Sequence, residues 1–226
     1  MNSPIIISLG GSIVVPDEVD TPFIKNFIAC IKERVSAGER FVITVGGGKT
    51  CRKYQASAAE LGANHEERDW IGIYTTQFNA QFMRVLFGAL AAPFIVIDPA
   101  DATGLTHSVI VAAGWKPGHS TDFDAILHAK STGAKRIVNL SNIDYAYDKD
   151  PKKFPDAKKI ERISWSEFRK IIPEKWEPGL NAPFDPTAAR EAEVLSLEVA
   201  IMNGRNLDNF KNYLDGKPFI GTVISS

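Results

Sequence analysis

The most constraining feature of the sequence is a run of three glycines, Gly46 to Gly48, between an apolar stretch and a predicted helix. Residues 41–45 are typical of a buried strand, and residues 49–56 are typical of a helix. Glycines at such a junction leave backbone amides open to an anion, and the helix N-terminus adds partial positive charge. Lys49 and Arg52 add full positive charges. The stretch therefore indicates a phosphate site, with a purely structural turn as the alternative.

A second glycine turn supports a ligand. Gly10 and Gly11 follow another apolar run, residues 4–9, that is typical of a central parallel strand. Parallel strands place their C-terminal ends at one edge of the sheet, where α/β proteins bind ligands. The glycine spacing matches neither the P-loop nor the dinucleotide-binding fingerprint, so a nucleotide site here belongs to another architecture.

The order of predicted elements indicates an α/β protein with a parallel sheet. Apolar residues at helical spacing predict a helix over 21–37, with Thr21 as N-cap and Pro22 at its first position. Asp69 is expected to cap a long helix that ends near Leu90, or alternatively to accept hydrogen bonds from a ribose. Other helices are predicted at 49–61, 121–129, 164–172, 185–196 and 206–214, other strands at 93–97, 106–112, 135–139, 197–202 and 219–224, and a loop at 176–183.

Composition excludes several classes of protein. The chain has 226 residues and a net charge of −1, so it has no broad basic surface for nucleic acid. Its two cysteines, Cys30 and Cys51, are not paired in a CxxC motif, which argues against disulfide and zinc frameworks. No stretch approaches the ~20 apolar residues of a membrane span, and no signal peptide precedes the first predicted strand. We therefore expect a cytoplasmic protein.

A third glycine-containing loop, residues 113–122, carries an unusual set of side chains. Trp115, Lys116 and His119 suit recognition of a base and its phosphate. The alternative is structural, because a surface histidine usually has no function and the next helix needs caps, for which the sequence offers Ser120, Thr121 and Asp122.

A fourth loop, residues 140–151, follows the strand predicted at 135–139. It contains a hydroxyl, an amide, several carboxylates and two tyrosines. The alternative to a binding role is a β-turn followed by a solvated linker.

Seven short motifs run along nearly the whole chain: Ser-Leu-Gly-Gly-Ser at 8–12, Gly-Gly-Gly-Lys-x-x-Arg-Lys-Tyr at 46–54, Asp-x-Ile-Gly-Ile at 69–73, Pro-Gly-His-Ser-Thr-Asp at 117–122, Ser-Asn-Ile-Asp at 141–144, Tyr-x-x-Asp-Pro-Lys-Lys at 147–153 and Asp-Pro-x-Ala-Ala-Arg at 185–190. Each alone is weak, but seven in this order are specific. By these motifs the chain resembles the amino-acid kinase superfamily and, within it, the uridylate (UMP) kinases of the archaeal type.

The resemblance implies one α/β/α sandwich domain, residues 1–226, around a mostly parallel sheet. Its N-terminal half, about 1–133, would bind the phosphoryl acceptor, and its C-terminal half, about 134–226, would bind ATP. The expected reaction is phosphoryl transfer from Mg-ATP to UMP in pyrimidine nucleotide biosynthesis. Relatives of this type assemble as hexamers built as trimers of dimers, so we expect a homo-oligomer with nucleotides as its small-molecule partners.

The resemblance also implies roles for single residues. The phosphates of ATP would meet Gly10, Gly11, Ser12, Gly48 and Arg52, and its nucleoside would be surrounded by Ser141, Asn142, Tyr147 and Asp150. UMP would be held by Gly47, Asp69, Trp115, Lys116, Pro117, Gly118, His119, Ser120 and Thr121. Candidates for a catalytic role are Arg52, Lys49, Asp122 and Asp144. Mg²⁺ would arrive with ATP, because no all-protein metal site is evident.

The chain departs from the family pattern in three places. Many members have a lysine two residues before the first glycine pair, where this chain has Ser8, so Arg52, Lys49 or Lys116 would supply that charge. Asp144-Tyr145 replaces the usual Asp-Gly. Trp115-Lys116 is an unusual pair in residues 115–121, the loop expected to hold UMP, which we call the acceptor loop. Two alternatives therefore remain: a kinase for another small phosphorylated acceptor, and a nucleotide-binding protein without turnover.

Overall fold

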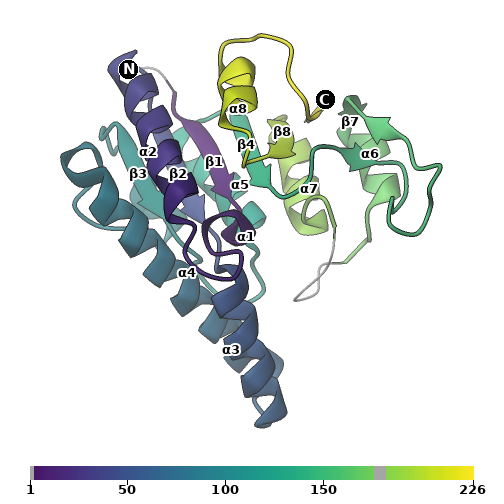
Figure 1. The fold of residues 1–226 in the computed structure, drawn as a ribbon, viewed down its shortest axis with the longest axis horizontal. Helices are drawn as coiled ribbons and strands as arrows, with labels where there is room; N and C mark the ends of the chain where they lie inside the picture. Colours follow the sequence, from purple (N-terminus) through teal and green to yellow (C-terminus); the bar gives the residue numbers. More distant parts are fainter. Residues whose placement is uncertain (1–2, 176–181) are drawn as a thin grey trace.

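The structure, a computed structural model, describes residues 3–175 and 182–226, so most of the loop predicted at 176–183 lies outside the described residues. Within these residues, a seven-stranded sheet has the order β3-β2-β1-β4-β8-β9-β7 (Figure 1). The first five strands in that order are parallel, β9 is antiparallel to β8, and β7 is parallel to β9. The strands are β1 (Ile5–Leu9), β2 (Phe41–Val45), β3 (Val109–Ala112), β4 (Arg136–Ser141), β7 (Arg162–Ser164), β8 (Glu198–Asn203) and β9 (Thr222–Ser225).

Helices cover both faces of the sheet and give the three layers that we expected. One face packs against α2 (Thr21–Ser36), α4 (His65–Phe87) and α8 (Leu207–Leu214), and the other against α5 (Thr121–Thr132), α6 (Trp165–Ile171) and α7 (Pro186–Val194). Strand β1 shows how the sequence produces this arrangement. Ile5, Ile7 and Leu9 are buried in the first core and Ile6 in the second, because successive side chains of a strand point to opposite faces.

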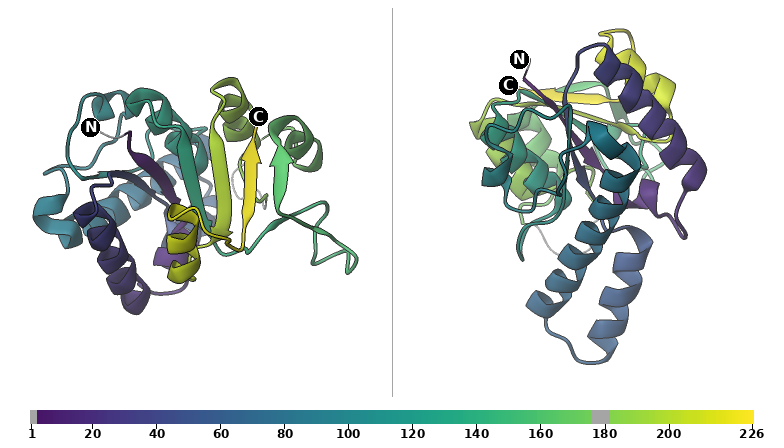
Figure 2. Two further views of the ribbon diagram at one scale, coloured as in Figure 1. Left: turned by 90° about the horizontal axis from the view of Figure 1, so that it is seen from above. Right: turned by 90° about the vertical axis from the view of Figure 1, so that its left-hand side faces the viewer.

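The shorter elements lie at the C-terminal ends of the parallel strands or at the periphery. The short helix α1 (Gly11–Val14) follows β1, and α3 (Gly48–Glu60) follows β2. In Figure 1, α3 pairs with α4 and both extend beyond the sheet. Strands β5 (Ala146–Tyr147) and β6 (Lys159–Ile160) form a hairpin whose green tip extends away from the rest in the left-hand view of Figure 2. Two 3₁₀ turns are Gly88–Leu90 and Pro99–Ala102. None of the helices in residues 3–175 and 182–226 has both the length and the apolar character needed to cross a membrane.

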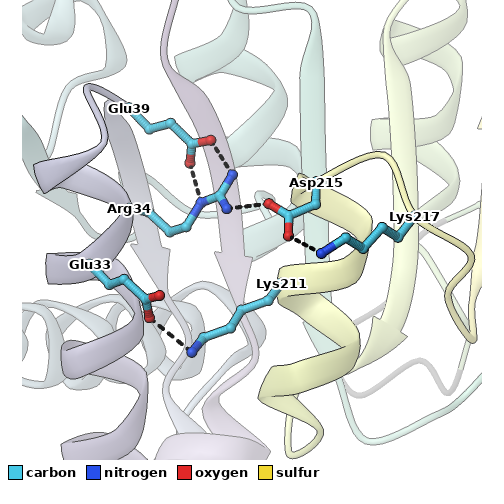
Figure 3. A network of polar contacts seen from close by, with 6 residues as sticks. All are labelled: Glu33, Arg34, Glu39, Lys211, Asp215 and Lys217. Carbon is cyan, nitrogen blue, oxygen red and sulfur yellow. Dashed lines mark hydrogen bonds and ion pairs between the residues drawn. The ribbon is translucent and has the colours of Figure 1, made fainter.

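Ion pairs join helix α2, near the start of the chain, to helix α8, near its end. Arg34 of α2 pairs with Glu39 and with Asp215, which follows α8 (Figure 3). Lys211 of α8 pairs with Glu33 of α2 at 2.9 Å. These contacts hold α2 and α8 side by side on one face of the sheet, although about 180 residues separate them in sequence.

Three predictions of local structure were wrong. Asp20 rather than Thr21 caps α2, because the Asp20 carboxylate accepts the Phe23 amide at 3.1 Å. The long helix begins at His65, where Asn64 and Glu67 form a capping box, so Asp69 lies inside the helix. Residues 93–97 form no strand, because only a single bridge from Val96 to Ala112 is made there.

A buried histidine lies on α5, on the face that packs against the sheet and the Pro99–Ala102 turn. The His128 side chain is 0% exposed, and neither ring nitrogen has a hydrogen-bond partner among the described residues. Burial lowers the pKa of His128 to about 4, against a smaller opposing effect of the negative charge of Asp98. The folded state therefore binds this proton less readily than the unfolded state does.

We expect His128 to make the fold sensitive to acid. The pKa of His128 falls from 6.5 to about 4 on folding. Its contribution to the free energy of unfolding is therefore fully present above pH 6.5 and is lost as the pH falls toward 4. Replacing His128 with Leu should remove about 2 kcal/mol of pH dependence between pH 7.5 and 5. Urea unfolding of both proteins at the two pH values measures this difference. An unchanged pH dependence in the Leu variant would contradict the assignment.

Candidate functional site

The two glycine turns are in direct backbone contact at the C-terminal edge of the sheet. Leu9 and Val45 are partners in the β1–β2 register, and the Gly46 amide donates to the Leu9 carbonyl at 2.9 Å. A Cβ added at Gly11 would lie 2.0 Å from the Gly48 nitrogen, and one added at Gly46 would lie 2.5 Å from the Gly11 nitrogen. No side chain fits between the turns, so glycine is required at both positions.

The cationic side chains that follow the second turn have different surroundings. Lys49 forms an ion pair with Asp17, which lowers the pKa of that carboxyl, and the Lys49 amide donates to the Val15 carbonyl at 2.9 Å. Arg52, one turn further along α3, is exposed and makes no hydrogen bond or ion pair within the described part of the chain. Of these two cations, Arg52 is therefore the one that remains available to a ligand.

Helix α4 connects the second glycine turn to the loop between β3 and α5. The Asn79 amide donates to the carbonyls of Gly46 at 2.8 Å and Gly47 at 3.1 Å. Three residues earlier, the Thr76 hydroxyl accepts the Gly114 amide at 2.8 Å. The structure thus brings Gly47 and the loop that begins at Gly114 against one face of a single helix.

Asp69 lies two helical turns before Thr76 on the same helix. Its carboxylate accepts the Gly118 amide at 3.0 Å, so it holds the tip of the loop instead of capping the helix. The residues predicted to bind the acceptor, from Gly47 through Asp69 to the 115–121 loop, therefore lie along α4.

Aromatic rings pack against one another in this loop and at the start of α5. The Trp115 and His119 rings are 5.6 Å apart, and the His119 and Phe123 rings are 4.7 Å apart in an edge-on arrangement. The Lys116 ammonium lies 3.5 Å from the centre of the Trp115 ring, a cation–π contact that directs its charge onto the indole. Ser120 caps α5 by accepting the Phe123 amide at 3.1 Å, which confirms its structural interpretation.

A row of buried polar side chains crosses the sheet one residue before its C-terminal edge. Ser8 is the register partner of both Thr44 and Asn139, so all three point to the α5 face. Asp122, in the first turn of α5, accepts the Ser8 hydroxyl at 2.8 Å and the Asn139 amide at 2.7 Å. The Thr44 hydroxyl is buried without a partner among the described residues. Ser8 thus does not leave a gap where the family has lysine, because it binds a carboxylate.

No positive charge among the described residues balances the charge of Asp122. Burial raises its pKa to about 6, the hydrogen bond from Ser8 opposes this effect, and the negative charge of Asp185 adds to it. The residue keeps some accessible surface, although its carboxylate is surrounded by protein. A buried carboxylate without a cation suits a site that receives a positively charged ligand or metal complex.

The predicted nucleoside-binding residues fall into two groups. Ser141 lies beside Gly10, whose amide donates to the Leu140 carbonyl, and the Ser141 hydroxyl is buried without a partner among the described residues. Asn142 follows it and is exposed. Tyr147 and Asp150 belong to the outlying β5–β6 hairpin, where the Asp150 carboxylate accepts the Lys152 amide and forms a turn.

Asp144 and Asp122 lie on opposite sides of the sheet, although both were candidates for a catalytic role. The Asp144 carboxylate accepts the Asn203 amide at 3.0 Å and lines a groove between α2 and α8, together with Cys30, Arg205 and Lys211. Asp122 packs on the α5 face. The structure therefore does not bring these two carboxylates together.

The described residues contain no cluster of three or more His, Cys, Asp or Glu side chains that could hold a metal ion. The unpartnered hydroxyl of Ser141 fits the nucleoside of a nucleotide, and the close approach of the two glycine turns leaves room for its phosphates beside their backbone. A Mg²⁺ ion here fits as a complex with those phosphates.

Sequence reasoning missed several residues of the site. Asn79 and Thr76, which hold the two loops, lie inside a long helix whose inward face is mostly apolar, so no motif marked them. Thr44 had a readable signal, because it is the lone polar residue near the end of an otherwise apolar strand, as Ser8 is. Asn139 was less distinct, because its strand also contains Arg136 and Ser141.

Comparison with known proteins identifies similar chains over the whole length. A profile of the amino acid kinase family matches residues 3–203. A uridylate kinase of Methanospirillum hungatei JF-1 is 34% identical over 224 residues, which cover 98% of this chain and 94% of that protein. A uridylate kinase of Methanobrevibacter smithii is 35% identical over 225 residues, covering 98% and 99%. The crystal structure of uridylate kinase from Archaeoglobus fulgidus superposes with a TM-score of 0.85 at 33% identity, covering 98% of this chain and all of that one.

We expect replacement of Asp122 by Asn to stabilise the ligand-free protein. The raised pKa favours the protonated carboxyl in the folded state, so the folded state is penalised as the pH rises from 3.8 through 6. Asparagine keeps an oxygen that can accept from Ser8 and carries no charge. The gain should be about 3 kcal/mol at pH 8 and about half that at pH 5, measured by urea unfolding. The exposed Asp101→Asn variant is the control and should change stability little; a destabilised Asp122→Asn protein at pH 8 would refute the expectation.

Proposed function

The chain belongs to the amino acid kinase family, and we propose that it is an ATP-dependent UMP kinase that forms UDP and ADP. The observation that carries the proposal is the contact between the two glycine turns, with the acceptor loop held to the second turn through α4. Similarity to uridylate kinases over nearly the full chain supports the same reaction.

The reaction joins two anions, so the main task of the site is to neutralise charge and align the reactants. An oxygen of the UMP phosphate attacks the γ-phosphorus of ATP, the bond to the β,γ-bridging oxygen breaks, and ADP leaves with the electron pair. The negative charge that builds on the transferred group would be stabilised by amides of the glycine turns and by the guanidinium of Arg52, which has no partner in the described part of the chain. The phosphates of ATP would contact Gly10, Ser12 and Gly48 in the same two turns.

The acceptor would lie along α4. Its phosphate would meet Gly47 and Arg52, and its ribose would accompany Asp69, whose second carboxylate oxygen is not used by the loop. The base would reach the 115–121 loop. In the C-terminal half, Ser141 and Asn142 would contact the nucleoside of ATP, with Tyr147 and Asp150 contributing from the hairpin. Mg²⁺ bound to ATP supplies charge neutralisation when present.

A second candidate function keeps the fold and changes the acceptor. The observation that favours it is the contact between Lys116 and Trp115, because it gives the loop a cation-capped indole that the family pattern does not predict. Another nucleoside monophosphate or a small phosphorylated metabolite would then replace UMP.

Measuring ADP release separates these functions. With Mg-ATP present, UMP, CMP, dTMP, AMP and GMP are offered in parallel, and UMP should be preferred by at least ~10-fold in kcat/KM. Arg52→Ala should lower turnover by ~100-fold, because it removes the available cation, whereas the neighbouring exposed Lys53→Ala should change it little. Preference for another acceptor would replace UMP in the proposal. ATP binding without any turnover would overturn the kinase assignment.

We further propose that two copies pair through α4 within a larger homo-oligomer. Its outward face carries six large apolar side chains, 37–76% exposed and spaced mostly four residues apart: Trp70, Tyr74, Phe78, Phe82, Val85 and Leu86. They expose on the order of 600 Å² of apolar surface, most of the ~800 Å² per partner that a standard interface buries. A stripe along one helix is self-complementary across a twofold axis.

The free cysteines Cys30 and Cys51 accord with a cytoplasmic location.

A charge in this stripe should separate the copies. Phe78 is 76% exposed, so Phe78→Glu should leave the subunit folded and shift the assembly toward smaller species. Val194→Glu, at a position 77% exposed on α7, is the matched control and should not change the assembly. Sedimentation velocity measures both. Identical distributions for Phe78→Glu and the unmodified protein would exclude this interface.

A further inference from the structure

The least explained charged group beside the acceptor loop is Asp124, in the helix that follows it. Its side chain is 1% exposed, in the first turn of α5, and helix capping does not explain it because Ser120 already caps that helix. Burial raises the pKa of Asp124, opposed by the hydrogen bond and charge of His119 and increased by Asp185. No lysine or arginine balances its charge among these contacts. The hydrogen bonds of this buried carboxylate indicate its role.

Both oxygens of Asp124 bind the loop that precedes the helix. One oxygen accepts the Trp115 amide at 3.3 Å, and the other lies 3.3 Å from Nδ1 of His119. With Nδ1 donating to the carboxylate, the free imidazole nitrogen is Nε2, which has no partner among the described residues. The His119 side chain is 18% exposed, so part of the ring is accessible to a ligand.

The place of this loop on α4 indicates which part of the acceptor it meets. Asn79 holds the glycine turn and Asp69 holds Gly118, and ten residues of helix separate them. That is about 15 Å at 1.5 Å per residue, enough to hold the phosphate of a nucleotide on the Asn79 side and its ribose on the Asp69 side. A phosphate at the glycine turn and a ribose beside Asp69 therefore direct the base toward the rings of Trp115, His119 and Phe123.

We propose that Asp124 is a positioning residue that holds His119 and Trp115 as the surface that recognises the base of the acceptor nucleotide. The inference rests on the proposed kinase function and adds to it the part of the loop that sets acceptor specificity. The imidazole presents Nε2 to the hydrogen-bonding edge of the base, and the flanking rings supply apolar contact. Asp124 acts through His119 and does not touch the reacting atoms.

The experiment compares Asp124→Asn, His119→Asn and the double variant with the unmodified protein. The Asp124→Asn side chain can still accept the Trp115 amide but lacks the charge that orients His119. The His119→Asn side chain keeps a donor near the position of Nδ1 and removes the Nε2 edge. Each single variant should raise KM for UMP ~10-fold, with KM for ATP and kcat within about threefold. The preference for UMP over CMP and dTMP should fall ~5-fold. Asp101→Asn is the control.

Coupling between the two residues is the decisive readout. If Asp124 acts through His119, the double variant should resemble either single variant, because the second change removes nothing further. Additive effects, an equal loss in KM for ATP, or an unchanged KM for UMP would overturn the proposal. If a thermal melt shows that Asp124→Asn does not fold, the test rests on His119→Asn, a change at a partly exposed position. An unchanged KM for UMP and an unchanged preference for UMP in that variant would overturn the proposal.

The failure of this inference can be told apart from the failure of the proposed function. UMP binding is measured by calorimetry in each protein alongside turnover. An unmodified protein that neither binds nor phosphorylates UMP would refute the kinase assignment and this inference with it. Binding by the unmodified protein, with equal affinity in both single variants, would refute the role of Asp124 alone.

Discussion

The site depends on the parallel pairing of β1 and β2. Their register sets Leu9 beside Val45, so the two chains leave the sheet at the same height and their glycine turns meet. A shift of one residue would turn every side chain of β1 to the opposite face and separate the turns. The apolar residues that bury both faces of β1 therefore also determine where amides are available to phosphate. Packing in the core and ligand binding at the edge are thus two results of one register.

Helix α4 transmits this arrangement to the second substrate. Its inward face binds the glycine turn through Asn79 and the acceptor loop through Thr76 and Asp69, while its outward face is apolar and exposed. Under the proposed function, one rigid helix sets the distance between the phosphate and the base of the acceptor. The polar row beneath α5 supports the same edge from the other side of the sheet, where Asp122 joins Ser8 to Asn139.

Much of this fold was accessible from the sequence because its signals are local. Apolar runs and glycine turns predicted the parallel strands, and Asp185 followed by Pro186 correctly predicted the start of α7. The errors arose where tertiary contacts decide: Asp69 has the chemistry of an N-cap, but Asn64 and Glu67 start the helix earlier and leave Asp69 to bind Gly118. The tasks of Asn79 and Asp124 could not be predicted, because their partners lie in other segments and only the folded chain brings them together.

Helix α5 holds three buried ionisable groups whose proton affinities change in opposite senses on folding. Asp122 and Asp124 bind their protons more tightly in the folded state, and His128 binds its proton less tightly. As the solution is acidified from neutrality, the folded chain gains protons at the carboxyls at one end of the helix while the unfolded chain gains one at the imidazole. The linkages of the carboxyls and of the imidazole oppose each other in the net proton uptake of unfolding. A weak pH dependence of unfolding would therefore conceal opposing ionisations within a single helix.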